Sequence, residues 1–205
     1  MTHPSRNRLF VATGNEDKLR EIREILDGSG IAAKGIHDVD PYPEPDESGE
    51  TLAENALIKA REGFLRTGLP SLADDSALEV EALGLAPGLY SSRFAGENVS
   101  YADNVRKLLR ELRSVPEAQR AARFRCVMAL VYRGHEVCWE GIAAGKITFG
   151  PQGENGFGYD SVFFSDELGR TFAEVPASEK NRVSHRGKAL KVLTSELKAI
   201  LSIQD

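Results

Sequence analysis

The chain has 205 residues, of which 26 are lysine or arginine and 31 are aspartate or glutamate, giving a net charge of -5. A chain of this length can bury a hydrophobic core large enough to be stable without disulfides or structural metal ions. No linker, repeat or low-complexity tract divides the chain, so we expect residues 1–205 to form a single domain, with room for two closely packed lobes. The acidic balance argues against broad binding to nucleic acid, so the basic residues are expected to act locally.

Signals for export, membrane insertion and disulfides are weak. Residues 1–7 are polar and lack the apolar core of a signal peptide, and no stretch approaches the roughly 20 apolar residues of a membrane span. Cys126 and Cys138 lie in separate apolar segments without metal-ligand spacing, which favours buried, reduced thiols. We therefore expect a soluble, cytoplasmic protein with no membrane partner.

The first third of the chain alternates strand and helix signals. Residues 8–13 are expected to form a buried strand, followed by a helix capped by Asn15. Residues 31–36 form a candidate second strand, 38–50 an acidic loop and 51–67 a second helix with a capping box. The inward face of the first helix is expected to hold Leu19, Ile22, Ile25 and Leu26.

The rest of the chain is richer in strand signals. Residues 77–83 are strand-like, Ser100 caps a third helix, and the apolar runs 124–132 and 136–147 predict a hairpin. The hairpin contributes antiparallel strands, so the sheet is predicted to be mixed. A further strand is expected over 159–164 and a closing helix over 188–201, with Leu190, Leu193, Leu197 and Leu201 inward.

Asp74, Asp75 and Ser76 follow the short apolar stretch 69–73, so we expect them in a turn where a strand ends at a sheet edge. Adjacent carboxylates repel and are costly to desolvate, so a buried pair indicates a cation, a proton or catalysis that compensates. The alternative is an acidic surface turn, because this tripeptide is ordinary turn chemistry.

A second polar segment joins the first strand to the first helix. A glycine turn and a helix start bring backbone N–H groups, the helix dipole and a lysine together, and this combination attracts phosphate. The spacing is not that of a P-loop, so a purely structural turn is the alternative. The segment consists of Thr13, Gly14, Asn15, Glu16, Asp17 and Lys18.

The segment Gly156-Phe157-Gly158-Tyr159-Asp160 places an aromatic ring between two glycines. Such a backbone can expose the ring to a flat ligand, so a nucleobase could stack there. The alternative is that the ring packs in the core and the glycines make turns.

Lys180 precedes a cluster of Ser184, His185 and Arg186. Most of these side chains donate hydrogen bonds and can address carbonyl or phosphate oxygens. The alternative is a solvated helix cap, because Ser184 can cap the last helix.

Taken in order, these segments resemble the inosine triphosphate pyrophosphatase family, over nearly the whole chain. Members of that family hydrolyse non-standard purine nucleoside triphosphates to the monophosphate and pyrophosphate. The segments that carry the resemblance are Thr13–Lys18, Glu54–Ala56 with Lys59, Ala73–Ser76, Pro87–Arg93, Gly156–Asp160 and Ser184–Arg186.

The resemblance implies an α/β fold with an elongated, mixed central sheet flanked by helices. It implies two lobes with an active-site cleft between them, and a homodimer. It also implies hydrolysis of ITP, dITP and XTP by attack at the α-phosphorus, which spacing alone does not separate from attack at the γ-phosphorus.

The resemblance also assigns roles at the triphosphate. Asp75 matches the residue that acts as general base and metal ligand. Asp74 and Glu47 would be further ligands of Mg²⁺, with Glu50 as the alternative to Glu47. Oxygen ligands suit this hard cation. The residues that hold the triphosphate are Lys18, Lys59 and Lys180, with the segment Thr13–Lys18 adding donors.

For the base, the resemblance implies stacking on Phe157. Hypoxanthine and xanthine carry an acceptor oxygen at C6 where adenine carries a donor, so a buried donor in the pocket would reject adenine at about 1–3 kcal/mol. The residues that address the base edge or lie near the nucleotide are Asp160, His185, Arg186, Ser76, Gly158 and Tyr159.

Ala77 departs from the family pattern, which commonly has glycine after Asp-Asp-Ser. The substitution is harmful only if this position needs a positive φ, so activity is expected to survive. Two other functions stay open at this point: a nucleotide sensor that does not hydrolyse, and a phosphohydrolase with different base selectivity.

Overall fold

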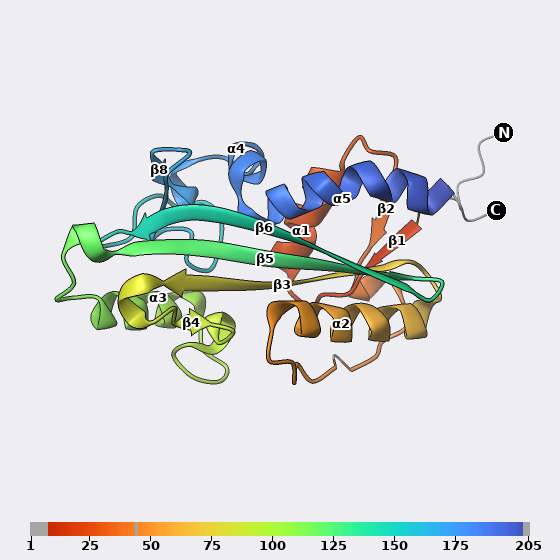
Figure 1. Cartoon of the computed structure of the whole chain (residues 1–205), viewed down its shortest axis with the longest axis horizontal. Helices are drawn as coiled ribbons and strands as arrows, with labels where there is room; N and C mark the ends of the chain where they lie inside the picture. The colour runs from red at the N-terminus through yellow and green to blue at the C-terminus, as the bar shows by residue number, and fades with distance from the viewer. Residues whose placement is uncertain (1–7, 44, 203–205) are drawn as a thin grey trace. The chain divides into compact units, whose positions relative to one another are not determined.

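Eight strands form one mixed sheet in the computed structural model, which describes residues 8–43 and 45–202 (Figure 1). The strands are β1 (Arg8–Val11), β2 (Ala32–Lys34), β3 (Ser71–Val80), β4 (Pro87–Gly88), β5 (Ala121–Tyr132), β6 (His135–Ile147), β7 (Phe163–Ser165) and β8 (Arg170–Thr171). Their order is β2-β1-β3-β5-β6-β7-β8, with β4 paired to β3. β1 is parallel to β2 and β3, whereas β4 is antiparallel to β3, and β7 is antiparallel to β6 and β8. The predicted mixed sheet is confirmed.

The helices are α1 (Glu16–Leu26), α2 (Leu52–Thr67), α3 (Tyr101–Glu111), α4 (Ala177–Val183) and α5 (His185–Ser202). Helices α1, α2 and α3 begin where the capping signals predict, whereas the closing helix begins at His185 and not at the expected residue 188. The Asn15 side chain accepts from two backbone N–H groups of α1, and Thr51 and Ser100 form capping boxes at α2 and α3. The short helix α4 was not predicted. No helix of the described chain has the length and apolar character needed to cross a membrane.

The chain divides into two compact units, each made of separate segments. Among the described residues, the first comprises 8–43, 45–75, 126–141 and 186–202, and the second comprises 76–125 and 142–185. Strands β3, β5 and β6 contribute residues to both units. Because the chain passes from one unit to the other several times, neither unit is a continuous stretch of sequence.

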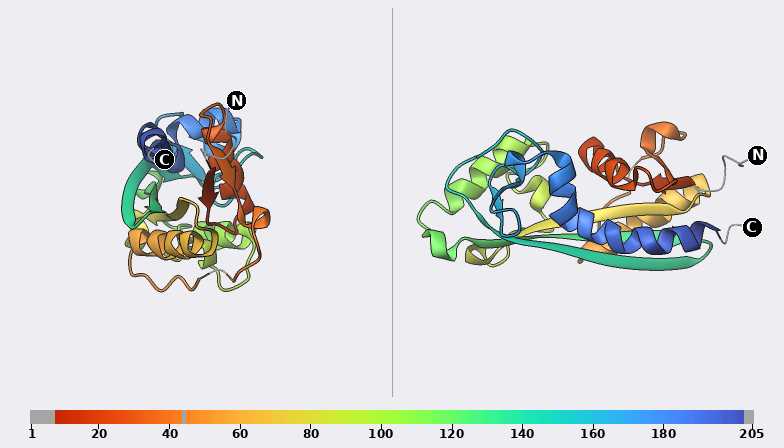
Figure 2. Two further views of the ribbon diagram at one scale, coloured as in Figure 1. Left: turned by 90° about the vertical axis from the view of Figure 1, so that its right-hand side faces the viewer. Right: turned by 90° about the horizontal axis from the view of Figure 1, so that it is seen from above.

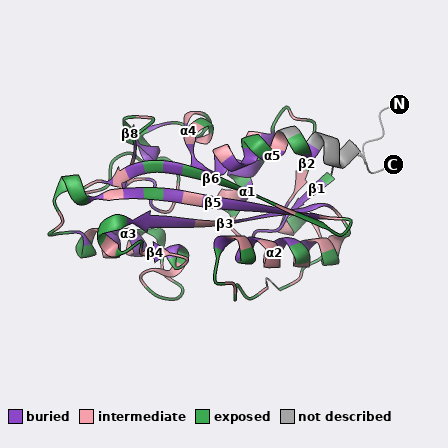
Figure 3. Ribbon diagram, viewed as in Figure 1, coloured by how far each residue is buried: buried purple, intermediate pink, exposed green. Residues whose placement is uncertain are grey.

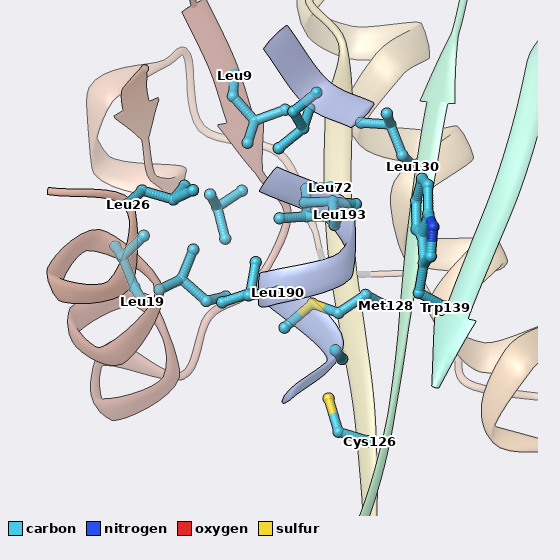
Figure 4. Close-up of a cluster of buried hydrophobic side chains, with 14 residues drawn as sticks. Leu9, Leu19, Leu26, Leu72, Cys126, Met128, Leu130, Trp139, Leu190 and Leu193 are labelled. Carbon is cyan, nitrogen blue, oxygen red and sulfur yellow. The ribbon is translucent and has the colours of Figure 1, made fainter. Parts of the chain in front are cut away.

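In the first unit, helices cover both faces of the strands: α2 lies on one face and α1 and α5 on the other (Figure 2). Leu19 and Ile22 of α1 pack with Leu190 and Leu193 of α5 against Trp139 and other strand residues (Figure 4). On the other face, small side chains of α2, among them Ala56, allow the helix to approach β1 and β3 closely. Side chains of the last turns of α5, including Leu201, lie outside the described part.

In the second unit, α3 packs its apolar face on the strands. Val105 and Leu108 lie in a cluster with Leu78, Phe124 and Phe163, and Leu112, just beyond the helix, joins it. The Phe124 ring lies 4.6 Å from the ring of Phe163 and 6.1 Å from the ring of Phe172. This core fixes the first turn of α3, which carries Tyr101.

Two of the predicted strand boundaries are wrong. The Asp74-Asp75-Ser76 segment was expected to be a turn, but it lies in the middle of β3. The register with β1 at Leu72 and with β4 at Leu78 holds both ends of the strand, so the polar segment between them stays extended. The strand expected over 159–164 begins only at Phe163, because Tyr159 to Val162 form a hydrogen-bonded turn.

The prediction of two buried thiols is correct for Cys126 and wrong for Cys138, which is exposed. The cause is the alternation of side chains along β6, where the neighbouring Trp139 takes the inward position. Both cysteines are free thiols.

Gly63 marks the closest approach of α2 to the strands. A Cβ at this position would collide with the Ser71 hydroxyl and would lie 2.9 Å from the Phe10 ring. The Ser71 Oγ is buried and has no hydrogen-bond partner within the described part of the chain. Glycine is therefore required here by packing, although it weakens the helix.

We expect Gly63→Ala to lower the free energy of unfolding by about 1–3 kcal/mol, because the added methyl overpacks the contact. At a solvent-exposed position of a helix, the same change would raise the free energy of unfolding by up to about 1 kcal/mol. Urea titration of the parent and the variant measures the difference. The loss should shrink in a Ser71→Ala background, which removes the colliding oxygen, and an equal loss in both backgrounds would contradict this explanation.

Candidate active site

Asp74 and Asp75 are adjacent on β3, a strand that is buried along almost its whole length (Figure 3). Successive side chains of a strand point to opposite faces, so the two carboxylates point in opposite directions. Both are buried, with 1 % of Asp74 and 8 % of Asp75 exposed. Each charge therefore needs its own compensation.

Asp75 faces α2. Asn55 and Lys59 are four residues apart on that helix and so share a face. The Asn55 amide donates to Asp75 Oδ2 over 3.3 Å, and Lys59 Nζ lies 3.7 Å from Asp75 Oδ1. Lys59 also donates to Glu47 Oε1 over 2.7 Å, which brings a loop carboxylate to the same ammonium group.

The pKa of the Asp75 carboxyl is raised above its ordinary value. Burial is the largest cause, and the charges of Glu47 and Asp74 add to it, whereas Lys59 and Lys18 oppose it. Burial alone would lower the pKa of Lys59, but Asp75 and Glu47 raise it above the ordinary value. Asp75 is thus a desolvated carboxylate whose charge is only partly compensated.

Asp74 faces α1 and α5. Its Oδ2 lies 3.1 Å from Lys18 Nζ and accepts a 2.9 Å hydrogen bond from Arg186. Arg186 also donates to Glu21 Oε2 over 2.5 Å, so two buried carboxylates bind one buried guanidinium. Burial alone would raise the pKa of Asp74, but Lys18 and Arg186 hold it well below the ordinary range. Asp74 is therefore ionised and paired with two cations.

The glycine turn before α1 brings Lys18 to this cluster. Thr13 Oγ1 accepts from the Asn15 N–H over 3.2 Å, which fixes the turn. Asn15 Oδ1 then accepts from the N–H groups of Asp17 and Lys18 over 3.0 and 3.1 Å. These two N–H groups are therefore occupied by the cap. The positive charge that this turn offers to a ligand is that of Lys18 Nζ. Gly14 and Glu16 are exposed.

In the second unit, Lys180 and Asp160 form a buried ion pair, with 2.5 Å between Nζ and Oδ2. The same Asp160 oxygen accepts from the Phe157 N–H over 2.9 Å. Lys180 Nζ also lies 4.8 Å from the centre of the Phe157 ring, within the range of a cation–π contact. The predicted ring, acid and lysine are thus brought together.

The other predicted residues of this unit differ in their burial and contacts. His185 is buried, and its ring stacks on Phe124 at 4.6 Å and 11°. The hydroxyl of Tyr159 donates to the Ser91 carbonyl over 2.9 Å, and burial raises the pKa of Tyr159. Gly158 has φ +62°, a conformation that favours glycine. Ser76 is half-buried and follows Asp75 in β3.

Two predicted residues have interaction partners other than those expected. Arg186, predicted at the base edge, binds Asp74 and Glu21 in the first unit. Lys180, predicted on the triphosphate with Lys18 and Lys59, binds Asp160 in the second unit. In both cases a buried carboxylate attracts the cation, and the sequence did not indicate which carboxylate lies nearest.

Asn55 and Glu21 belong to the site although neither was singled out. Asn55 is held by the Gly49 N–H, which donates to its Oδ1 over 2.8 Å, so its amide group points to Asp75. The sequence does indicate both residues, because each lies at helical spacing from a lysine of the site. Asn55 stands four positions before Lys59, and Glu21 stands three positions after Lys18.

The carboxylates suit a hard cation on the Asp75 side only. Asp75 and Glu47 converge on one ammonium group, and Mg²⁺ in proteins is typically held by one or two carboxylates together with phosphate oxygens. Asp74 is already bound by two cations, and Glu50 has its side chain in solvent. Within residues 8–43 and 45–202, no three metal-binding side chains gather in one group.

Ala77 is buried in β3 with extended backbone. The non-glycine residues with positive φ in the described part are Leu85, Asn98 and Arg133. The position after Asp-Asp-Ser therefore does not require glycine in this chain.

Comparison with known proteins gives one family. The model of the Ham1 family matches residues 9–196. The dITP/XTP pyrophosphatase of Geobacter sulfurreducens is 50 % identical over 191 residues, which cover 93 % of this chain and 96 % of that protein. The dITP/XTP pyrophosphatase of Haemophilus influenzae is 46 % identical and covers 94 % and 100 %.

Solved structures agree with the sequence relatives. A HAM1 protein from Coxiella burnetii superimposes with a TM-score of 0.83 at 40 % identity, covering 94 % of this chain and 99 % of that one. A nucleoside-triphosphatase, dITP/XTP pyrophosphatase, from Mycobacterium abscessus gives a TM-score of 0.72 at 43 % identity, with coverage of 91 % and 98 %. The mixed α/β fold is therefore shared with these proteins.

We expect Asp74→Ala to lower the free energy of unfolding by about 3–5 kcal/mol, because it leaves Arg186 and Lys18 buried beside one remaining carboxylate. Urea titration at pH 7 measures the loss. The matched control is Glu136→Ala, which breaks an exposed pair with Arg61 and should cost about 1 kcal/mol or less.

The loss should also depend on pH. A lowered pKa in the folded state gives stability that is complete above the ordinary carboxyl pKa and disappears as pH falls through the folded value. The difference between the parent and Asp74→Ala should therefore be constant from pH 5 to pH 8 and shrink only in more acidic solution. A difference that shrinks near neutral pH would contradict the assignment of an ionised Asp74.

Proposed function

Because the chain belongs to the Ham1 family, we propose that it hydrolyses the non-standard purine nucleoside triphosphates ITP, dITP and XTP to the monophosphate and pyrophosphate. The observation that supports this most directly is Asp75, a buried carboxylate with a raised pKa beside Asn55 and Lys59. A desolvated, incompletely compensated carboxylate is typical of a catalytic base. The protein thereby removes non-standard nucleotides from the pool.

The triphosphate is held by the first unit. Lys18 and Lys59 present ammonium groups that are only partly buried, with side-chain exposures of 17 % and 11 %. The turn around Thr13 and Asn15 adds polar side chains close to Lys18. Positive charge at these positions also stabilises the pyrophosphate leaving group.

In the reaction, a water molecule attacks the α-phosphorus and its proton passes to a carboxylate oxygen of Asp75. The bond between the α-phosphorus and the bridging oxygen breaks, and that oxygen leaves with pyrophosphate. Asn55 orients Asp75 through its amide donor, so it acts as a positioning residue.

The cofactor that suits these residues is Mg²⁺. Asp75 and Glu47 would hold it, and it would supply positive charge that offsets the charge developing on the phosphate oxygens. Glu47 is preferred to Glu50 because its carboxylate reaches the same ammonium group as Asp75.

The base is bound by the second unit, through stacking on Phe157. Asp160 and Lys180, which hold that ring, supply an acceptor and a donor for the base edge. A donor that faces the C6 oxygen of hypoxanthine or xanthine would be left unpaired by the amino group of adenine. Contact of Arg186 with the base would require it to leave Asp74 and Glu21.

We further propose a cytoplasmic homodimer. Dimerisation rests on the family resemblance, and the cytoplasmic location fits two free cysteines and a substrate from the nucleotide pool.

We expect release of pyrophosphate from ITP and XTP, with little from ATP or GTP, and loss of activity with a chelator. Separate quantitation of pyrophosphate and orthophosphate from each nucleotide measures this. Orthophosphate as the product would instead identify a phosphatase. Nucleotide binding without any product would identify a sensor.

We expect Asp75→Asn to reduce kcat for ITP by about 10²-fold or more while nucleotide binding persists, because the amide keeps the shape but accepts no proton. Steady-state kinetics and calorimetric titration measure the two properties. Glu136→Gln, an exposed substitution in the same unit, is the control and should leave both unchanged. Undiminished turnover in Asp75→Asn would exclude this residue as the base.

A further inference from the structure

Tyr101 is the first residue of α3 and has no part in the reaction described above. Its position is fixed by the Ser100 cap, whose hydroxyl accepts from the Asp103 N–H while the Asp103 carboxylate accepts from the Ser100 N–H. The helix is anchored further along by Val105 and Leu108 in the core. The Tyr101 side chain nevertheless remains 42 % exposed. An exposed aromatic side chain at a well-anchored position is suited to contact a mobile or ligand-binding neighbour.

That neighbour is Phe157. The two ring centres lie 5.8 Å apart with 44° between the ring planes, which is a favourable tilted arrangement. Both residues line a cavity of roughly 430 Å³, whose wall also includes Arg106 and Glu154. Tyr101 therefore meets the stacking ring at a cavity large enough for a small flat ligand.

Phe157 lies in a stretch without regular secondary structure, between Gly156 and Gly158, which both have positive φ. Its N–H donates to Asp160, and Lys180 Nζ lies over its ring. Tyr101 adds an aromatic contact to the same ring.

We propose that Tyr101 is a positioning residue for base recognition, which orients the Phe157 ring for stacking on the purine. The inference rests on the proposed function, in which Phe157 stacks on the base. An aromatic pair contributes little to the overall stability of a domain, but a ring that is already oriented loses less freedom when the base binds. Tyr101 should therefore affect binding of the base and not the chemical step.

The test compares Tyr101→Ala and Tyr101→Phe with the parent enzyme. We expect Tyr101→Ala to raise KM for ITP on the order of threefold to tenfold, with kcat unchanged, because one aromatic contact is lost. Tyr101→Phe keeps the ring and should behave as the parent. Inhibition by inorganic tripolyphosphate, which has no base, should be the same in all three proteins.

The matched control is Tyr132→Ala. It removes a tyrosine whose ring lies 5.3 Å from His135 in the first unit, so it deletes a similar ring contact away from Phe157. This variant should leave KM and kcat for ITP unchanged. A comparable rise in KM for both alanine variants would overturn the proposal, as would a fall in kcat confined to Tyr101→Ala.

Phe157→Ala separates this inference from the proposed function. If Phe157→Ala leaves KM for ITP unchanged, stacking itself is wrong and the role of Tyr101 fails with it. If Phe157→Ala raises KM and Tyr101→Ala does not, only the role of Tyr101 is wrong. We expect the double variant to match Phe157→Ala alone, because Tyr101 acts through that ring. Additive effects would show that Tyr101 acts independently and would overturn the proposal.

Discussion

Burial of two adjacent carboxylates on one strand is the constraint on which the rest of the first unit depends. Asp74 and Asp75 form their ion pairs with different cations, because strand geometry directs them to opposite faces of β3. Each face is covered by helices, so those helices must carry cations within otherwise apolar surfaces. Lys18 of α1 and Arg186 of α5 serve one face, and Lys59 of α2 serves the other.

The two carboxylates differ in what their surroundings allow them to do. Asp74 has two cations on one oxygen and a lowered pKa, so it remains ionised and holds Lys18 and Arg186 in place. The negative charge of Glu47 disfavours ionisation of Asp75, whereas the positive charge of Lys59 favours it, and the pKa of Asp75 is raised. In the proposed reaction, side chains of the same type thus take a structural and a reactive role because their environments differ.

Local signals in the sequence predicted much of this arrangement. The caps at Asn15, Thr51 and Ser100 are determined by neighbouring residues, and all three are present. The ion pair of Arg186 with Asp74 joins residues 112 positions apart, and no local pattern specifies it. The same is true of β3, whose polar middle has turn composition and stays extended because β1 and β4 pair with its ends.

The glycines around Phe157 show how one sequence pattern can have two physical causes. They are compatible with a ring that is open to a ligand, and Gly156 is also required by packing, because a Cβ there would collide with the Asp160 carboxylate. That carboxylate accepts from the Phe157 N–H and binds Lys180 through the same oxygen. A shift of the ion pair therefore moves the backbone that carries the ring. Orientation of the ring and the Asp160–Lys180 ion pair are consequently coupled in one buried group.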